Sequence, residues 1–463
     1  MQSPSKTIAI IGAGITGLTT AFKLEQAGFE VVVYEASAHA GGQIRTHQED
    51  GYLVESGPHT LLARDALPDL VDELGLGDRL IVANDQANKR FLVRYGEPKA
   101  APMGPGAFLK TDILSPLAKL RLFAEPFIGQ GPSQEESLAE FVTRRLGREP
   151  LEFGVGPMVA GTFAGDASKL SVEHAFPKLY KLEQEHGSLT WGMIKKVLAG
   201  RKTPASEKKS HPKLISFDAG SQVLTEALLD RLDADVEFGA NVYSLAEKDN
   251  GRWKLCFRQA GKRRQKTVDA VVSTAPAHRL AEIDLDTAKE PSSFAPLGDI
   301  YYAPVSIVAL GFLREDIAHP LDGFGMLIPR EERRNILGTL FMSSLFEGRA
   351  PEGEVLLTSF VGGARQPELA LEDGDTLIDK TLADLDSLLG VSGEPVFTEH
   401  IAWKEAIPQY EVGYGRFHEV IDRIESAHKG LYLAGSYRNG IAIPDLVTGA
   451  YELAERISEG YRD

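Results

Sequence analysis

Residues 7–17 read Thr-Ile-Ala-Ile-Ile-Gly-Ala-Gly-Ile-Thr-Gly, and this stretch decides the fold. Thr7–Ile11 is a short apolar run of the kind that forms a buried parallel strand. A G-x-G-x-x-G pattern follows at once, and residues 18–27 have the apolar spacing of a helix. Residues 30–34 read as a second strand, with Glu35 at its end. This order of strand, glycine turn, helix, strand and acid predicts a dinucleotide-binding unit.

Each residue type in the turn suits a physical task. Gly12 permits the tight turn, Gly14 lets the backbone approach a pyrophosphate, and Gly17 lets helix and strand pack closely. The helix N-terminus offers free N–H groups to phosphate. Glu35 can accept hydrogen bonds from ribose hydroxyls, which disfavours a 2′-phosphorylated cofactor. A glycine turn with no ligand is the alternative, and the complete strand–helix–strand context favours the binding site.

Two further segments extend this pattern. Residues 41–46 read Gly-Gly-Gln-Ile-Arg-Thr, and residues 55–60 read Glu-Ser-Gly-Pro-His-Thr. A doubled glycine and a basic residue this close to Glu35 suit a longer, enclosed dinucleotide. Together these segments resemble the FAD-binding N-terminus of the flavin amine oxidase superfamily. In that superfamily the second glycine pair lines the pyrophosphate and flavin, and the Gly-Pro turn lies near the isoalloxazine ring.

Composition sets limits on the other classes of function. A chain of 463 residues is too long for one hydrophobic core, so two or three domains are expected. The net charge of −16 argues against nucleic-acid binding. Cys256 is the only cysteine, so no intrachain disulfide can form. Apolar stretches are too short to span a bilayer, so the expected location is cytoplasmic, with any membrane contact peripheral and on the inner face. The histidines are scattered, and no metal site is expected.

The predicted fold class is α/β. Residues 430–437 repeat the pattern of strand and glycine turn, so the start, middle and end of the chain are expected to build one discontinuous Rossmann-like FAD-binding domain. Four β runs between residues 302 and 362 predict a mixed or antiparallel sheet in an α+β substrate domain. The predicted division is 1–87, 213–290 and 398–463 for FAD; 88–110, 187–212 and 291–397 for substrate; and 111–186 for a helical subdomain.

One stretch is more specific than the glycine turn. Residues 163–171 read Phe-Ala-Gly-Asp-Ala-Ser-Lys-Leu-Ser, Phe176-Pro177 follows, and residues 182–189 contain Leu-Glu and Gly-Ser. This series resembles the protoporphyrinogen and coproporphyrinogen oxidase branch of the superfamily. The resemblance implies oxidation of protoporphyrinogen IX to protoporphyrin IX by FAD, with O2 as acceptor and H2O2 as product. It leaves coproporphyrinogen III open as the substrate.

The resemblance also assigns cofactor contacts. The ADP half, the flavin ring and the closing C-terminal segment are expected to be held by Gly12, Ala13, Gly14, Ile15, Thr16, Gly17, Glu35, Ala36, Gly42, Gln43, Arg45, Gly57, Pro58, His59, Thr60, Val242, Trp403, Gly435, Ile441, Ala442 and Ile443. Residues 434–436 read Ala-Gly-Ser where the family more often has Gly-Gly-Asn. No catalytic base is evident. His59 is the one candidate acid or base, and packing beside the flavin is the simpler role for it.

Arg90 is the candidate substrate residue, because guanidinium matches the geometry of a propionate carboxylate. A surface arginine on a strand is the alternative. Other functions remain open as well: a related FAD amine oxidase or carotenoid desaturase, or a tetrapyrrole-binding flavoprotein without catalysis. Further expected partners are a second copy of the chain and ferrochelatase, as receiver of the product.

Two segments have competing interpretations. The helical region 111–199 corresponds to a membrane-associating domain in some relatives of the resembled branch, yet its apolar residues are expected to be mostly core, with a minority exposed around the substrate entrance. Residues 195–213 are rich in Lys and Arg, and a solvated loop is favoured over lipid binding.

Overall fold

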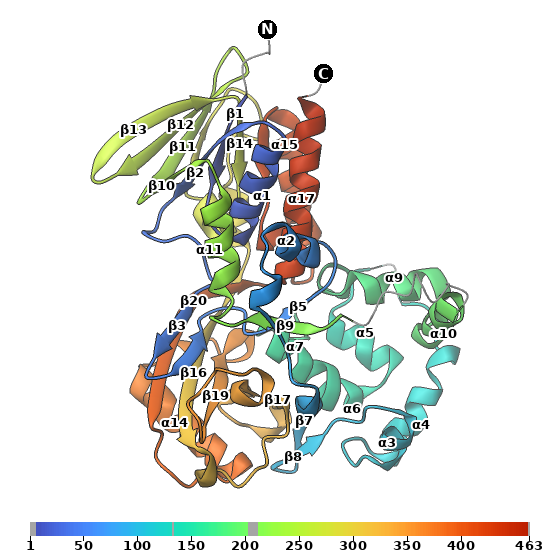
Figure 1. The fold of residues 1–463 in the computed structure, drawn as a ribbon. Coiled ribbons are helices and arrows are strands. Elements are labelled where there is room, and N and C mark those ends of the chain that lie inside the picture. Colours follow the sequence, from blue (N-terminus) through green and yellow to red (C-terminus); the bar gives the residue numbers. More distant parts are fainter. Residues whose placement is uncertain (1–5, 132–133, 202–211, 462–463) are drawn as a thin grey trace.

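The computed structural model describes residues 6–131, 134–201 and 212–461. A parallel sheet with its helices forms one end of the molecule, a larger sheet forms the other end, and a lobe of helices lies beside the larger sheet (Figure 1). The fold is mixed α/β, as the sequence predicts.

The parallel sheet joins strands that are far apart in the sequence. Its order is β10-β2-β1-β14-β21, and every neighbouring pair is parallel. Helices α1 (Ile15–Gln26) and α17 (Ile443–Gly460) pack against each other on one face (Figure 1). The other face packs against the four-stranded sheet β13-β12-β11-β15 in a second apolar core. The strands are β1 (Thr7–Ile11), β2 (Glu30–Glu35), β10 (Asp235–Phe238), β11 (Asn241–Glu247), β12 (Trp253–Gln259), β13 (Lys262–Val268), β14 (Ala270–Ser273), β15 (Asp284–Asp286) and β21 (Leu431–Leu433).

The larger sheet has seven strands in the order β20-β16-β19-β18-β17-β7-β8. All its pairs are antiparallel except β7 with β17, so the sheet is mixed. One face is covered by α14 (Gly374–Leu389), and the hairpin of β3 (Thr46–Glu49) and β4 (Tyr52–Glu55) packs on the other. The strands are β7 (Lys89–Arg94), β8 (Glu97–Ala100), β16 (Tyr302–Leu313), β17 (Gly323–Leu327), β18 (Ile336–Phe341), β19 (Glu354–Gly362) and β20 (Phe397–Pro408).

A three-stranded sheet in the order β5-β9-β6 and several short helices connect these parts. Its strands are β5 (Leu61–Leu62), β6 (Leu80–Val82) and β9 (Leu214–Phe217). The remaining helices outside the lobe are α2 (Leu67–Glu73), α11 (Gln222–Arg231), α12 (Ala277–Leu280), α13 (Met342–Leu345), α15 (Gly415–Ala427) and α16 (Ser436–Asn439).

The helical lobe has a small apolar core and one long exposed surface. Its helices are α3 (Pro105–Lys110), α4 (Pro116–Phe123), α5 (Leu138–Arg145), α6 (Arg148–Pro150), α7 (Gly156–Phe163), α8 (Val172–Ala175), α9 (Pro177–His186) and α10 (Leu189–Arg201). Helix α4 buries no residue, and Phe127 just after it is 89% exposed. Most apolar residues of the region 111–199 are buried or half-buried, as expected, and α4 belongs to the exposed minority.

The strand pairing adds detail to the predicted division. Strand β20 pairs with β16 in the seven-stranded sheet, whereas the prediction grouped residues 398–463 with the FAD segments. Helix α10 packs against α9 in the lobe, whereas residues 187–212 were grouped with the substrate domain. The three-domain division itself stays a prediction. Of the predicted basic loop, residues 195–201 belong to α10 and residues 202–211 lie outside the described residues.

Candidate functional site

The carboxyl ends of the parallel strands define the site. Ile11 lies opposite Tyr34 on one side and Ser273 on the other, and Ser273 lies opposite Leu433. The residues that come next on all four strands therefore emerge at one edge of the sheet: Gly12, Glu35, Thr274 and Ala434. Ligands of open parallel sheets bind at this edge, where the loops diverge.

The glycine turn leaves room for a ligand at one position and none at another. A Cβ on Gly17 would lie 2.0 Å from the Gly12 carbonyl oxygen, so strand and helix meet backbone to backbone. Thr274 Oγ donates to the same carbonyl at 3.2 Å. A Cβ on Gly14 would meet nothing within 4 Å, and α1 begins there without a side-chain cap. The open space and the free N–H groups of α1 fit a pyrophosphate.

Glu35 is held at the end of β2 by two backbone donors. Its carboxylate accepts hydrogen bonds from Ala13 N and Ser37 N, each at 2.8 Å. The carbonyl oxygen of Glu35 accepts from Ala240 N at 2.8 Å, which brings the start of β11, and Val242 with it, to the same edge. Each carboxylate oxygen keeps a second lone pair for a ribose hydroxyl.

The second glycine pair, Gly41 and Gly42, packs directly against the glycine turn that follows β1. Gly41 N donates to Ala13 O at 2.8 Å, and a Cβ on Gly42 would lie 3.3 Å from Gly14 Cα. Gln43 Nε2 donates to Ala406 O at 2.8 Å, at the end of the larger sheet. A Cβ on Gly57 would lie 2.1 Å from Gln43 O. Segments 41–43 and 57–60 are therefore fixed side by side, as a flavin lying along both would need.

Trp403 and His59 bring the two sheets together around this point. Trp403 Nε1 donates to Ser56 O at 2.6 Å. His59 is 6% exposed, and its ring meets Phe360 edge-on at 4.9 Å. Burial lowers the pKa of His59 to about 4, against the opposing effect of a hydrogen bond with the Gly57 backbone. Its Nε2 has no hydrogen-bond partner among the described residues, so a neutral imidazole presents a free polar atom where the flavin ring is expected.

The C-terminal segment supplies the last part of the cradle. Gly435 has φ +127°, and Ala434 N donates to Ser273 O at 2.9 Å. Ala442 precedes α17 in an extended conformation without a side-chain cap, Ile443 is buried, and Ile441 packs against both the sheet core and the core of the lobe. The structure thus gathers segments 12–17, 35–43, 57–60 and 435–443, although their contacts with a cofactor stay predictions. Arg45 Nε, also buried, has no partner among the described residues.

Arg90 lies on the face of the larger sheet that turns toward this cradle. Arg90 lies on β7, and strand pairing connects β7 through β17 and β18 to β19. The register of these pairs places Arg90 on the same face of the sheet as Phe360 and Trp403. The guanidinium carbon is 5.3 Å from the centre of the Phe324 ring. Arg90 is exposed, and its side chain makes neither an ion pair nor a hydrogen bond with any described residue. It is free to bind an acid of a ligand.

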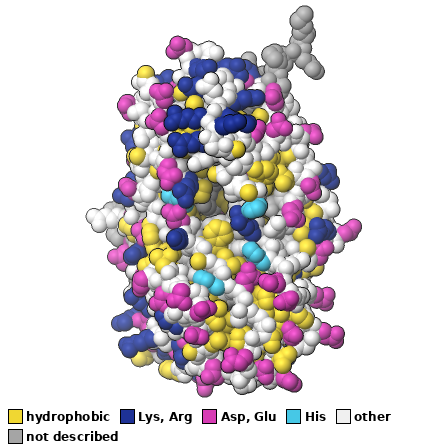
Figure 2. Space-filling view, turned by 90° about the vertical axis from the view of Figure 1, so that its left-hand side faces the viewer, with side chains coloured by type: hydrophobic (Ala, Val, Ile, Leu, Met, Phe, Trp, Pro, Cys, Tyr) yellow, Lys and Arg dark blue, Asp and Glu magenta, His cyan; other side chains and the backbone are white. Residues whose placement is uncertain are grey.

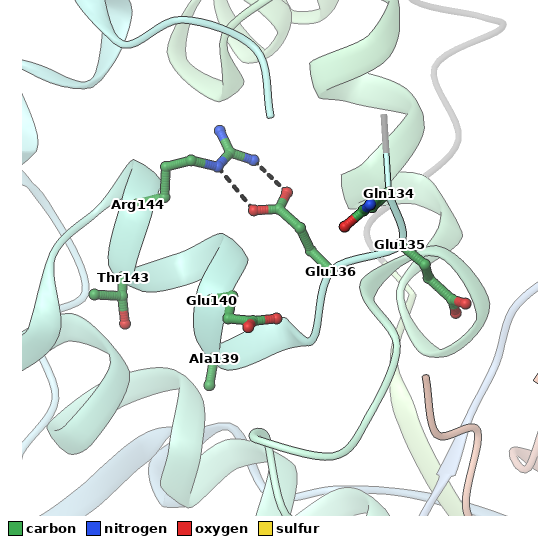
Figure 3. A pocket seen from close by; sticks show the side chains of 7 residues that line it. All are labelled: Gln134, Glu135, Glu136, Ala139, Glu140, Thr143 and Arg144. Atoms are coloured by element: carbon green, nitrogen blue, oxygen red, sulfur yellow. Dashed lines mark hydrogen bonds and ion pairs between the residues drawn. The ribbon is translucent and has the colours of Figure 1, made fainter. Parts of the chain in front are cut away.

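The molecule is hollowed between its two sheet-bearing ends, and basic and histidine side chains border the hollow (Figure 2). A separate cavity of about 610 Å³ lies in the helical lobe, lined by Gln134, Glu135, Glu136, Ala139, Glu140, Thr143 and Arg144 (Figure 3). It shares no residue with the glycine cradle. Three of its seven lining residues are glutamates, and Arg144 is already paired with Glu136 at 2.6 Å. The cradle, and not this cavity, therefore has the features of a dinucleotide site.

Two residues near the cradle, Thr274 and Tyr410, lack a specific signal in the sequence. Thr274 supports the glycine turn. The small residues at the end of segment 268–276 do indicate a close backbone approach, but they do not identify Thr274 as its contact. Tyr410, which binds the 435–442 loop, follows no recognisable local pattern.

Comparisons with known proteins agree with this geometry. The profile of the family described as flavin containing amine oxidoreductase matches residues 15–458. The chain is 33% identical over 476 residues to protoporphyrinogen oxidase 2, chloroplastic/mitochondrial, of Arabidopsis thaliana, covering 98% of this chain and 94% of that protein. It is 32% identical over 474 residues to coproporphyrinogen III oxidase of Bacillus subtilis (strain 168), covering 96% and 97%. A crystal structure named as a candidate protoporphyrinogen oxidase of Exiguobacterium sp. 255-15 superimposes with a TM-score of 0.82 at 25% identity, covering 98% and 99%.

The chain belongs to the flavin containing amine oxidoreductase family. It is a flavin-dependent oxidoreductase whose similar proteins include oxidases named for two different porphyrinogens.

Proposed function

We propose that this protein binds FAD and oxidises a porphyrinogen to the porphyrin, with protoporphyrinogen IX as the main substrate. The observation that carries the proposal is the similarity, over nearly the whole length of both chains, to oxidases of this reaction class. Bound FAD would supply the hydride-accepting chemistry, with O2 as final acceptor and H2O2 as product. The protein's own contribution is to position the substrate and exclude water.

The cradle supports FAD as the flavin. Segments 12–17 and 35–43 offer backbone N–H groups and a ribose-facing carboxylate, which a flavin mononucleotide would leave unused. Segment 57–60 continues the cradle toward the larger sheet, where a flavin ring would lie.

Arg90 is the residue we assign to a substrate propionate. Its neighbour Lys89 is paired with Asp322, whereas the Arg90 guanidinium has no acidic partner among the described residues. A charged hydrogen bond to a carboxylate would orient the macrocycle across the face that Phe360 and Trp403 share.

His59 has the wrong protonation state for a general acid at neutral pH. Its lowered pKa of about 4 keeps the imidazole neutral, so it can exchange a hydrogen bond but does not carry a proton to give. We therefore assign His59 to hydrogen bonding beside the flavin, and no other side chain to acid–base catalysis.

Coproporphyrinogen III is the second candidate substrate, because a coproporphyrinogen III oxidase is among the similar proteins. Steady-state assays of both porphyrinogens with the purified FAD-loaded protein, side by side in air, test the proposal. For at least one substrate we expect porphyrin fluorescence and H2O2 to form faster than by autoxidation. We expect protoporphyrinogen IX to be turned over faster than coproporphyrinogen III. Turnover of an amine or a carotene instead, or porphyrin binding without flavin reduction, would contradict it.

We also propose that the helical lobe contacts a membrane surface from the cytoplasmic side. Helix α10 packs against the turn that follows α4, and both present exposed apolar side chains. This lobe patch consists of Leu117, Leu120, Phe123, Phe127, Trp191, Met193, Ile194, Val197 and Leu198. No helix among the described residues is long and apolar enough to cross a bilayer. A homodimer and transfer of product to ferrochelatase stay predictions.

A further inference from the structure

The segment that follows β20 touches both the helical lobe and the loop that is expected to close over the flavin. Gln409 Nε2 donates to Phe163 O at 2.9 Å, at the end of α7. Ser171 N donates to Tyr410 O at 2.8 Å, and Val412 N donates to Lys169 O at 2.9 Å. Residues 409–412, which we call the link, are thus paired with the residues of the lobe on which the family resemblance rests.

The other side of the link holds the 435–442 loop. The Tyr410 hydroxyl donates to Ser436 O and accepts from Gly440 N, the latter at 3.0 Å. Tyr410 is 6% exposed, and burial raises the pKa of its phenol, so the hydroxyl keeps its proton for donation. Gly440 has φ +107° and lies between α16 and α17, where the loop has no strand pairing of its own.

Two tyrosine hydroxyls bind the backbone of this loop: Tyr414 donates to Tyr437 O at 2.7 Å, and Tyr410 bridges Ser436 and Gly440. A phenol that both donates and accepts fixes the distance between Ser436 and Gly440, and hence the path of residues 441–443. Ile441 packs against the cores on both sides of this contact. A displacement of α7 would move Gln409 and Tyr410 together, because they are adjacent in the chain.

We propose that Tyr410 is a positioning residue for the flavin, and that the link passes the position of the helical lobe to the flavin-closing loop. The proposal rests on the FAD part of the proposed function and is independent of the substrate. Neither Gln409 nor Tyr410 is assigned contact with FAD, so the effect of these residues on the cofactor would be exerted through the 435–442 loop.

The first test compares FAD binding by the apoprotein of Tyr410→Phe with that of a matched control. Tyr461→Phe also removes one phenol hydrogen bond to a backbone carbonyl, that of Asp269, at a distant edge of the molecule. Loss of the Tyr410 hydroxyl removes the hydrogen bonds of two partly buried backbone groups, so the FAD dissociation constant should rise about tenfold by fluorescence titration. The control should stay within about twofold of the wild type by the same reasoning. A Tyr410→Phe protein that binds FAD like the control overturns the positioning role.

The second test cuts the lobe side of the link with Gln409→Met. Backbone hydrogen exchange in peptides covering residues 435–442 should become faster, although Gln409 makes no hydrogen bond to this loop. The double variant should bind FAD no more weakly than Tyr410→Phe alone, because both changes act through one contact. Unchanged exchange in Gln409→Met, or fully additive losses, would overturn the coupling. A wild-type protein that fails to bind FAD would overturn the proposed cofactor instead.

Discussion

At the glycine turn, backbone meets backbone, whereas the helical lobe buries a group of charged side chains beside its apolar core. A Cβ on Gly17 would lie 2.0 Å from Gly12 O, so the flavin end excludes even one added methyl group. In the lobe, Arg145 is 0% exposed and binds Glu125 and Glu183, while α4 on the same lobe buries nothing. The flavin end is therefore sensitive to added volume, and the lobe to lost charge. The two regions should fail under different changes.

The largest expected effect is in the lobe. Arg145→Met would leave Glu125 buried without its arginine and Glu183 with Arg144 alone, which should lower the free energy of unfolding by about 3–5 kcal/mol. Arg148→Met is the matched control, because Arg148 is 82% exposed and pairs only with Glu152. Urea unfolding of both variants measures the difference. Equal, small losses would mean that the buried network does not hold the lobe together.

At the flavin end, Gly17→Ala should cost about 3 kcal/mol, because the strand and helix must separate to accommodate the methyl group. Gly14→Ala is the control: its Cβ has open space and its φ of −76° suits alanine, so the apoprotein should keep its melting temperature. Its FAD affinity should nevertheless fall, because the methyl would occupy space predicted for pyrophosphate. Thermal unfolding and FAD titration separate the two effects. Normal FAD binding by Gly14→Ala would contradict this location for the phosphates.

The two regions should also differ in pH dependence. The folded pKa of His59, about 4, is below its unfolded value of about 6.5, so its contribution to stability is present above pH 6.5 and is lost as pH falls toward 4, by about 3 kcal/mol. Burial by itself would raise the pKa of Glu125 and Glu183, but hydrogen bonds to both and the arginines beside Glu183 hold it low. The lobe carboxylates therefore lose their contribution only below about pH 4.3.

Unfolding measured from pH 7 to 4 checks the His59 effect. His59→Gln should reduce the slope of stability with pH over this range. An unchanged slope in His59→Gln would contradict a buried neutral imidazole.

A substitution of Arg90 tests the predicted substrate-binding role of the larger sheet. Arg90→Met should raise the KM for a porphyrinogen about 30-fold, since a hydrogen bond between charged groups contributes about 2 kcal/mol. The melting temperature should hardly change, because the guanidinium makes no ion pair with described residues. Lys89→Met is the neighbouring control, and its KM should stay near that of the wild type. An equal rise in KM in both variants would show that the positive charge acts on the substrate at long range and that Arg90 makes no specific contact with it.

The smallest effect on folding is expected at the lobe patch. Leu117→Ser with Phe127→Ser should change the unfolding free energy by less than about 0.5 kcal/mol, because both side chains are exposed. Binding to phospholipid vesicles should fall about tenfold or more, since each side chain would lose apolar contact with lipid. Leu313→Ser, at an exposed position on the larger sheet, is the control for vesicle co-sedimentation. Equal vesicle binding by all variants would contradict the proposed membrane contact.

The parts of the site that could be predicted are those encoded by neighbours in the chain. The spacing of Gly12, Gly14 and Gly17 between two apolar runs leads directly to the observed turn, because the required conformations are local. Thr274 and Tyr410 could not be assigned their roles, because each depends on a partner from another segment. Which residues form the exposed minority of the lobe could not be predicted for the same reason, because the apolar spacing of α4 is compatible with core and with surface.

The amino-acid sequence by itself determined the parallel dinucleotide-binding architecture, because glycine spacing and strand hydrophobicity act over a few residues. Its motifs also carried the resemblance to the flavin amine oxidase superfamily. Only the tertiary structure decided which face of the lobe is bare, that Arg90 turns toward the cradle, and that residues 409–412 join lobe to loop. Those features depend on which distant segments pack together, and no short stretch of the chain specifies such a partner.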